Sequence, residues 1–190
     1  MDVRLREWLN YDYKSPKVWL QTLQEMELAV VHSGLPYKVR ALRTHALRRW
    51  SETRHAALFA YGMSQRMPNY QFDFACCEAA DYDAVVRWRR GNEQVFAPIQ
   101  LKEFVPEELN RGATLEKLFC DLSRYSDSSD LVVVVLLNRR FTLAPGPIHC
   151  APLRLGGVYL VGAITSDQSK WCLIGDLLDR FGHLSVFAHP

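Results

Sequence analysis

A continuous run of aliphatic residues at positions 131–137 (LVVVVLL) constrains the fold more than any other feature of the sequence. The run has the length of a strand, and it offers no polar residue to a solvent-facing side. Such a strand is typical of a sheet that is covered on both faces. The run therefore predicts an α/β protein whose layers surround a central buried strand.

Periodicity and turn residues predict the elements around this run. Ser15 and Pro16 are typical of a helix start, and Thr114 is the expected N-cap of a later helix. The predicted helices cover residues 16–33, 39–61, 112–125 and 171–181. The predicted strands cover residues 70–77, 83–90, 93–104, 131–137, 158–165 and 184–188. A meander, a crossover helix and a buried strand together indicate a mixed sheet with helices on its faces.

The hairpin expected over residues 83–104 gathers polar side chains at one end. A two-residue turn at Gly91 and Asn92 places Asp83 opposite Gln100 and Asp81 opposite Lys102. Side chains alternate along a strand, so Asp83, Gln100 and Lys102 share one face. The opposite face is apolar and is expected to cover the core; it carries Ala84, Val86, Trp88, Val95, Ala97, Ile99 and Leu101. An alternative reading is a solvated face with an ion pair between Asp81 and Lys102.

The three polar residues suit the hydrolysis of a phosphodiester. That reaction needs a divalent cation held by hard oxygen ligands and a positive charge near the phosphate. Asp83 offers a carboxylate, Gln100 an amide oxygen, and Lys102 an ammonium group that can orient water or stabilise charge.

Asp83 and the tripeptide Gln100-Leu101-Lys102 resemble the motif of the PD-(D/E)xK nuclease superfamily. In that family an aspartate opens the second core strand, and a (D/E/Q)-x-K tripeptide lies on the third. The resemblance implies a restriction-endonuclease-like α/β/α sandwich with a mixed central sheet and an αβββαβ core. Within a single domain, this core is expected over residues 39–137, with an N-terminal helical extension at 1–38 and a C-terminal strand-helix-strand addition at 138–190.

The resemblance also implies a Mg²⁺- or Mn²⁺-dependent endonuclease that acts on DNA. Asp83 and Gln100 are the expected metal ligands, together with a glutamate from the preceding helix, for which Glu52 is the candidate and Glu78 the alternative. Two residues depart from the family pattern: Tyr82 replaces the usual proline, and Gln100 replaces the usual acid. The lost negative charge favours the alternative of a catalytically inactive protein that binds nucleic acid or serves as an assembly module.

Basic residues supply candidate contacts to DNA. The formal net charge is only +2, so the distribution of charge matters more than its sum. Arginines cluster at positions 40–54 and 87–90, and Arg48, Arg49, Arg87 and Lys117 are the expected DNA-binding residues. The alternative for each cluster is an ordinary solvated surface.

Cysteine usage and hydropathy indicate a cytoplasmic protein. The five cysteines form no CxxC pair and are odd in number, which disfavours a disulfide framework and a zinc site. Charged residues at the N-terminus disfavour a secretory signal, and no apolar stretch approaches the roughly 20 residues of a membrane span. A homodimer or a protein partner is left open.

Overall fold

The computed structural model describes residues 3–36, 39, 44, 47–77, 79, 81–125, 128–139, 153–179 and 182–190. The chain divides into two compact units, Met1–Phe96 with Pro190, and Ala97–His189. Seven strands form a mixed sheet in the order β1-β2-β3-β4-β5-β6-β7. The broad α/β class predicted from the sequence is therefore confirmed.

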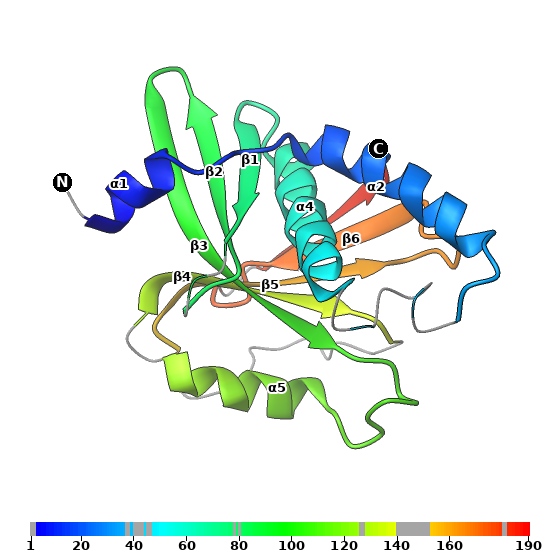
Figure 1. The fold of residues 1–190 in the computed structure, drawn as a ribbon. Coiled ribbons are helices and arrows are strands. Elements are labelled where there is room, and N and C mark those ends of the chain that lie inside the picture. Colours follow the sequence, from blue (N-terminus) through cyan, green and yellow to red (C-terminus); the bar gives the residue numbers. More distant parts are fainter. Residues whose placement is uncertain are drawn as a thin grey trace. The chain divides into compact units, whose positions relative to one another are not determined.

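Among its described residues, the first unit holds three helices and two complete strands (Figure 1). The helices are α1 (Val3–Leu9), α2 (Pro16–Val31) and α4 (Arg48–Arg66), and the strands are β1 (Gln71–Cys76) and β2 (Ala84–Arg90). The predicted helix start at Ser15 and Pro16 is confirmed, because Ser15 is the extended N-cap of α2. The helix expected over 39–61 is described from Arg48 onward and continues to Arg66, and most of residues 39–46 lie outside the described residues.

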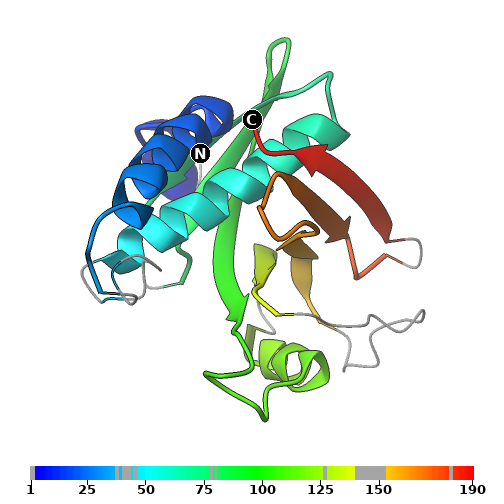
Figure 2. The same cartoon turned by 90° about the vertical axis from the view of Figure 1, so that its right-hand side faces the viewer.

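Helix α4 packs on β1 and β2, and α2 packs on α4. The two helices run side by side (Figure 2). The Arg54 guanidinium of α4 lies 3.0 Å from the Glu27 carboxylate of α2. Under α4, the antiparallel register of β1 and β2 places Phe72 beside Trp88 and Phe74 beside Val86. Phe74 and Val86 are fully buried, so this face of the pair forms the core of the first unit.

The N-terminal segment covers the opposite face of the hairpin. Gly91 adopts a φ of 59° in the predicted two-residue turn between β2 and β3 (Glu93–Phe104). The rings of Trp8 and Tyr13 both lie close to Phe96, with centroid distances of 6.3 and 6.1 Å. The face predicted to be polar is therefore partly closed by aromatic residues.

The apolar face of the hairpin is shorter than predicted. Ala84, Ala97 and Ile99 are buried as expected, whereas Val95 is 44% exposed. The prediction that Val95 covers the core is wrong, because the strands continue past the packed layer near the turn and leave the tip of the hairpin in solvent.

In the second unit, one helix covers the parallel strands (Figure 1). The elements are α5 (Leu115–Asp121), a 3₁₀ helix η2 (Leu122–Tyr125), β4 (Ser128–Leu137), β5 (Leu155–Ala163), β6 (Lys170–Gly175) and β7 (His183–Ala188). The Thr114 hydroxyl accepts a hydrogen bond of 3.2 Å from the Lys117 amide, which confirms the predicted N-cap. β4 pairs in parallel with β3 and β5, and its residues 133–136 are almost fully buried, as the aliphatic run predicts.

The helix predicted over residues 171–181 is wrong. Residues 170–175 form β6, which pairs antiparallel with both β5 and β7. The apolar run at Trp171–Ile174 is too short to distinguish a helix from a buried strand, and pairing on both edges decides in favour of the strand. Among the described residues, no helix is long and apolar enough to cross a membrane.

Candidate functional site

Asp83 and Glu52 lie in the first unit, where Arg48 pairs with Glu52. The Arg48 Nε donates a hydrogen bond of 2.7 Å to the Glu52 carboxylate, one helical turn away on α4. This hydrogen bond and the charge of Glu52 raise the pKa of Arg48, and the charge of Asp83 adds a smaller increase. Glu52 is therefore ion-paired with Arg48 on the surface of α4.

The backbone fixes Asp83 at the entry to β2. Its carbonyl oxygen accepts a hydrogen bond of 3.2 Å from the Cys77 amide, directly after β1 ends. The preceding residue, Tyr82, is buried, and its hydroxyl accepts a hydrogen bond of 2.9 Å from the Trp8 indole. Asp83 thus lies between the buried Tyr82 and the first residue of β2, one residue before the strand that it is predicted to open.

Gln100 and Lys102 lie in the second unit on the same face of β3. The parallel register places Gln100 beside Val133 and Lys102 beside Val135. Both valines belong to the core that contains Leu115 of α5, so Gln100 and Lys102 share that face. The Lys102 ammonium lies 5.4 Å from the centre of the Tyr125 ring, which is close enough for a cation–π contact.

Asp83 and Glu52 thus lie in the first unit, and Gln100 and Lys102 lie on one face of β3 in the second. Their union into one four-residue site stays a prediction. The alternative acid, Glu78, lies outside the described residues.

The four predicted DNA-binding residues have different surroundings. Arg48 and Arg49 are adjacent at the start of α4. The exposed Lys117 ammonium donates a hydrogen bond of 3.2 Å to the Gly112 carbonyl oxygen. Arg87 is mostly buried; it donates a hydrogen bond of 2.9 Å to Asp73 and lies over the Tyr13 ring. Arg87 therefore has a structural role in the first unit, whether or not it also contacts a ligand.

The donor chemistry of the predicted site fits a hard divalent cation. Asp83, Glu52 and Gln100 offer carboxylate and amide oxygens, which Mg²⁺ and Mn²⁺ prefer over sulfur or imidazole ligands. Within the described part of the chain, no group of three or more histidine, cysteine, aspartate or glutamate residues converges on a single point. The predicted site holds only two carboxylates, so its third protein ligand is the amide of Gln100.

Sequence reasoning missed two features next to Asp83. One is the buried pair of Trp8 and Tyr82, whose partners are far apart in sequence. The other is a pocket at the junction of α2, α4 and β1, which includes Lys14, Arg49 and Trp50. Both features join residues that are far apart in sequence, so local patterns do not predict them. The concentration of tryptophan in the N-terminal half of the chain is the sequence feature that both share.

Comparison of the chain with protein-family models, with curated proteins and with solved structures gives no match. The likeness to PD-(D/E)xK nucleases therefore depends on the motif at Asp83, Gln100 and Lys102 and on the order of the elements.

Proposed function

We propose that the protein is a metal-dependent endonuclease that hydrolyses phosphodiester bonds in DNA. The main supporting observation is the order α4-β1-β2-β3-α5-β4, with Asp83 directly before β2 and with Gln100 and Lys102 on one face of β3. A glutamate on the helix before the meander and an aspartate at the start of the second strand are the acids that the PD-(D/E)xK motif requires.

The order of elements supports a restriction-endonuclease-like fold. Helix α4 precedes the strands β1, β2 and β3, and α5 then leads to β4, which pairs in parallel with β3. This is the αβββαβ sequence of the family core. The helices α1 and α2 and the strands β5 to β7 are then additions at the two ends.

Each residue of the proposed site has a distinct role. Asp83, Glu52 and Gln100 hold the cation through oxygen atoms. A cation held there would supply Lewis-acid chemistry at the phosphate and would help to activate a water molecule. Lys102 stabilises negative charge that develops on the phosphate. Arg48, Arg49 and Lys117 attract the DNA backbone and set its position without reading its sequence.

Cleavage of supercoiled plasmid in Mg²⁺ or Mn²⁺ tests this proposal. The wild type is expected to nick or linearise the plasmid, and Asp83→Ala and Lys102→Ala are each expected to reduce the rate by at least about 100-fold. Asp179→Ala and Lys170→Ala are matched controls, because both residues are exposed and lie outside the proposed site. Equal cleavage by the wild type and Lys102→Ala would show that any activity comes from a contaminant.

A second candidate function is DNA binding without cleavage. It is favoured by Gln100, which removes one negative charge from the metal site, and by Arg48, which offsets the charge of Glu52. A binding-only protein is expected to hold DNA with an affinity that falls steeply with salt and to leave the plasmid intact. If the Gln100→Glu variant cuts the plasmid and the wild type does not, this result would support the second function. It would also indicate that the protein descends from a nuclease.

A further inference from the structure

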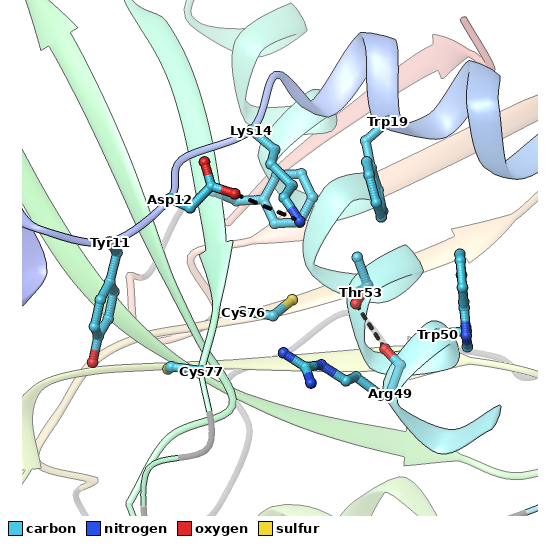
Figure 3. Close-up of a pocket in the computed structure, with 10 residues that line it drawn as sticks. Tyr11, Asp12, Lys14, Trp19, Arg49, Trp50, Thr53, Cys76 and Cys77 are labelled. Atoms are coloured by element: carbon cyan, nitrogen blue, oxygen red, sulfur yellow. Dashed lines mark hydrogen bonds and ion pairs between the residues drawn. The ribbon is translucent and has the colours of Figure 1, made fainter. Parts of the chain in front are cut away.

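A pocket of about 500 Å³ opens at the junction of three segments of the first unit (Figure 3). The segments are residues 11–19, residues 49–53 of α4, and residues 74–77 at the end of β1. An isolated β-bridge joins the first segment to the third: the backbone N–H groups of Lys14 and Phe74 each donate to the other's carbonyl oxygen, at 2.8 and 3.1 Å. The volume lies within the roughly 300 to 1,000 Å³ of small-ligand sites.

Two tryptophan rings form one wall of the pocket. Trp19 and Trp50 are nearly parallel, with an interplanar angle of 11° and a centroid distance of 6.5 Å. Both side chains are half-buried, and the Trp19 indole N–H is buried with no acceptor within the part of the chain that the structure describes. Parallel indoles beside an open volume can extend their stack onto a flat, aromatic ligand that also brings a hydrogen-bond acceptor.

Two cations border the same pocket. The Lys14 ammonium lies 4.4 Å from the centre of the Trp19 ring and 4.0 Å from the Asp12 carboxylate. In Figure 3 this ammonium and the Arg49 guanidinium extend from the walls toward the middle of the pocket. Lys14 and Arg49 outnumber Asp12, so the lining carries a net positive charge and favours an anion beside the aromatic wall.

The pocket adjoins the residues of the proposed nuclease site within the same unit. Cys77 lines the pocket, and its amide donates to the carbonyl oxygen of Asp83. Arg49, on another wall, directly follows Arg48, which pairs with Glu52. A ligand in the pocket is therefore a near neighbour of whatever Asp83 and Glu52 bind.

We propose that this pocket binds one unpaired nucleotide of a DNA strand, next to the phosphate that is cut. The base packs on the indoles of Trp19 and Trp50, and its phosphate lies between Lys14 and Arg49. A nucleotide combines an aromatic base, which suits the tryptophan wall, with a phosphate, which suits the two cations. A base becomes available for stacking on protein side chains only when it leaves the duplex. The identification of the ligand as DNA rests on the proposed function, and it implies a preference for single-stranded or distorted DNA.

Fluorescence anisotropy with a labelled dT8 oligonucleotide in EDTA tests this proposal without any cleavage. The wild type is expected to bind dT8 more tightly than an eight-base-pair duplex. Lys14→Gln and Trp50→Leu are each expected to weaken binding roughly tenfold, since a stacked base or a phosphate contact is lost. Lys17→Gln is the matched control, because Lys17 is exposed on α2 outside the pocket.

Several results separate the outcomes. Equal affinity for dT8 in the wild type, Lys14→Gln and Trp50→Leu would overturn the proposal, as would binding of free dTMP as tight as that of dT8. Lys14 joins β1 through its backbone, so Lys14→Gln is expected to stay folded even where Trp50→Leu does not. Absence of plasmid cleavage together with the expected binding pattern would contradict the nuclease proposal alone and would still support the nucleotide pocket.

Discussion

The Trp8 indole donates a hydrogen bond of 2.9 Å to the hydroxyl of Tyr82, which immediately precedes Asp83. The two rings meet edge to face, with a centroid distance of 6.1 Å and an interplanar angle of 83°. Both residues are buried, and the Tyr11 hydroxyl lies 3.4 Å from that of Tyr82. In the proposed likeness to PD-(D/E)xK nucleases, Tyr82 stands where their motif has proline. We infer that its contact with α1 restricts the backbone directly before Asp83.

Replacing Tyr82 with phenylalanine tests this anchor. Tyr82→Phe leaves the buried Trp8 N–H without its acceptor, so we expect the free energy of unfolding to fall by about 1–3 kcal/mol in urea denaturation. We also expect cleavage to fall, because Asp83 loses its fixed position. The double variant Trp8→Phe, Tyr82→Phe is expected to lose less stability than the two single variants combined, since it leaves no orphaned donor.

Tyr70→Phe is the matched control for this anchor. The Tyr70 hydroxyl accepts an exposed hydrogen bond of 3.4 Å from Arg90, so its removal is expected to change stability by at most about 0.5 kcal/mol. A loss of stability as large as that of Tyr82→Phe would contradict the anchoring role.

Asp73 is predicted to be the most sensitive charged residue of the first unit. It is 6% exposed and accepts hydrogen bonds of 2.9 Å from Arg87 and 2.8 Å from Arg89. Asp73→Asn leaves two guanidinium groups without their counter-charge, so we expect a loss of roughly 3 kcal/mol in chemical denaturation. Asp81→Asn, at an exposed position, is the control and is expected to be nearly neutral. Equal stability of both variants would show that the Asp73 cluster contributes nothing.

The thiol of Cys77 is predicted to be unreactive near neutral pH. Burial raises its pKa from the ordinary 9.0 to about 11, so at pH 8 it holds roughly 100-fold less thiolate than an ordinary cysteine. In a Cys76→Ala variant, mass spectrometry after iodoacetamide treatment is expected to show slow labelling of Cys77 and fast labelling of the exposed Cys120. Equal labelling rates would contradict the burial of Cys77 in the pocket wall.

The same shift gives a pH dependence of stability. The folded chain keeps the Cys77 thiol neutral, so its contribution to stability is complete below pH 9 and is lost as the pH rises from 9 toward 11. Cys77→Ala is therefore expected to lose less stability than the wild type over this interval. An identical decline in both proteins would assign the loss to other groups.

Gly175 is predicted to tolerate no side chain. Its φ is 141°, and an added Cβ would lie 2.7 Å from a ring carbon of Tyr159 and 2.8 Å from the Val158 carbonyl oxygen. Gly175→Ala is expected to lower the free energy of unfolding by about 2 kcal/mol or more, measured by urea denaturation. Gly34→Ala is the control, because nothing lies within 4 Å of its added methyl group. A stable Gly175→Ala protein would contradict this close approach of β5 and β6.

Local patterns predicted most of the secondary structure. The buried strand at 131–137, the turn at Gly91 and the cap at Thr114 depend on residues that are close in sequence, and each was found as expected. The strand at 170–175 was missed because its stability comes from two neighbouring strands that contribute nothing to its local pattern.

Contacts between distant segments were beyond the reach of the sequence. The pocket depends on the backbone bridge between Lys14 and Phe74, and the Asp83 anchor depends on Trp8. Strand alternation and one tight turn predict the grouping of Asp83, Gln100 and Lys102, and this grouping stays a prediction. Aromatic stacking and buried ion pairs such as that of Asp73 and Arg87 have no comparable short-range signal.

Diffraction at the manganese absorption edge from a crystal soaked in Mn²⁺ tests the central claim most directly. The account predicts one anomalous peak bound by the carboxylate of Asp83 and the amide oxygen of Gln100, with the Lys102 ammonium nearby. No peak there, with the Asp83 carboxylate and the Gln100 amide turned away from each other, would contradict it.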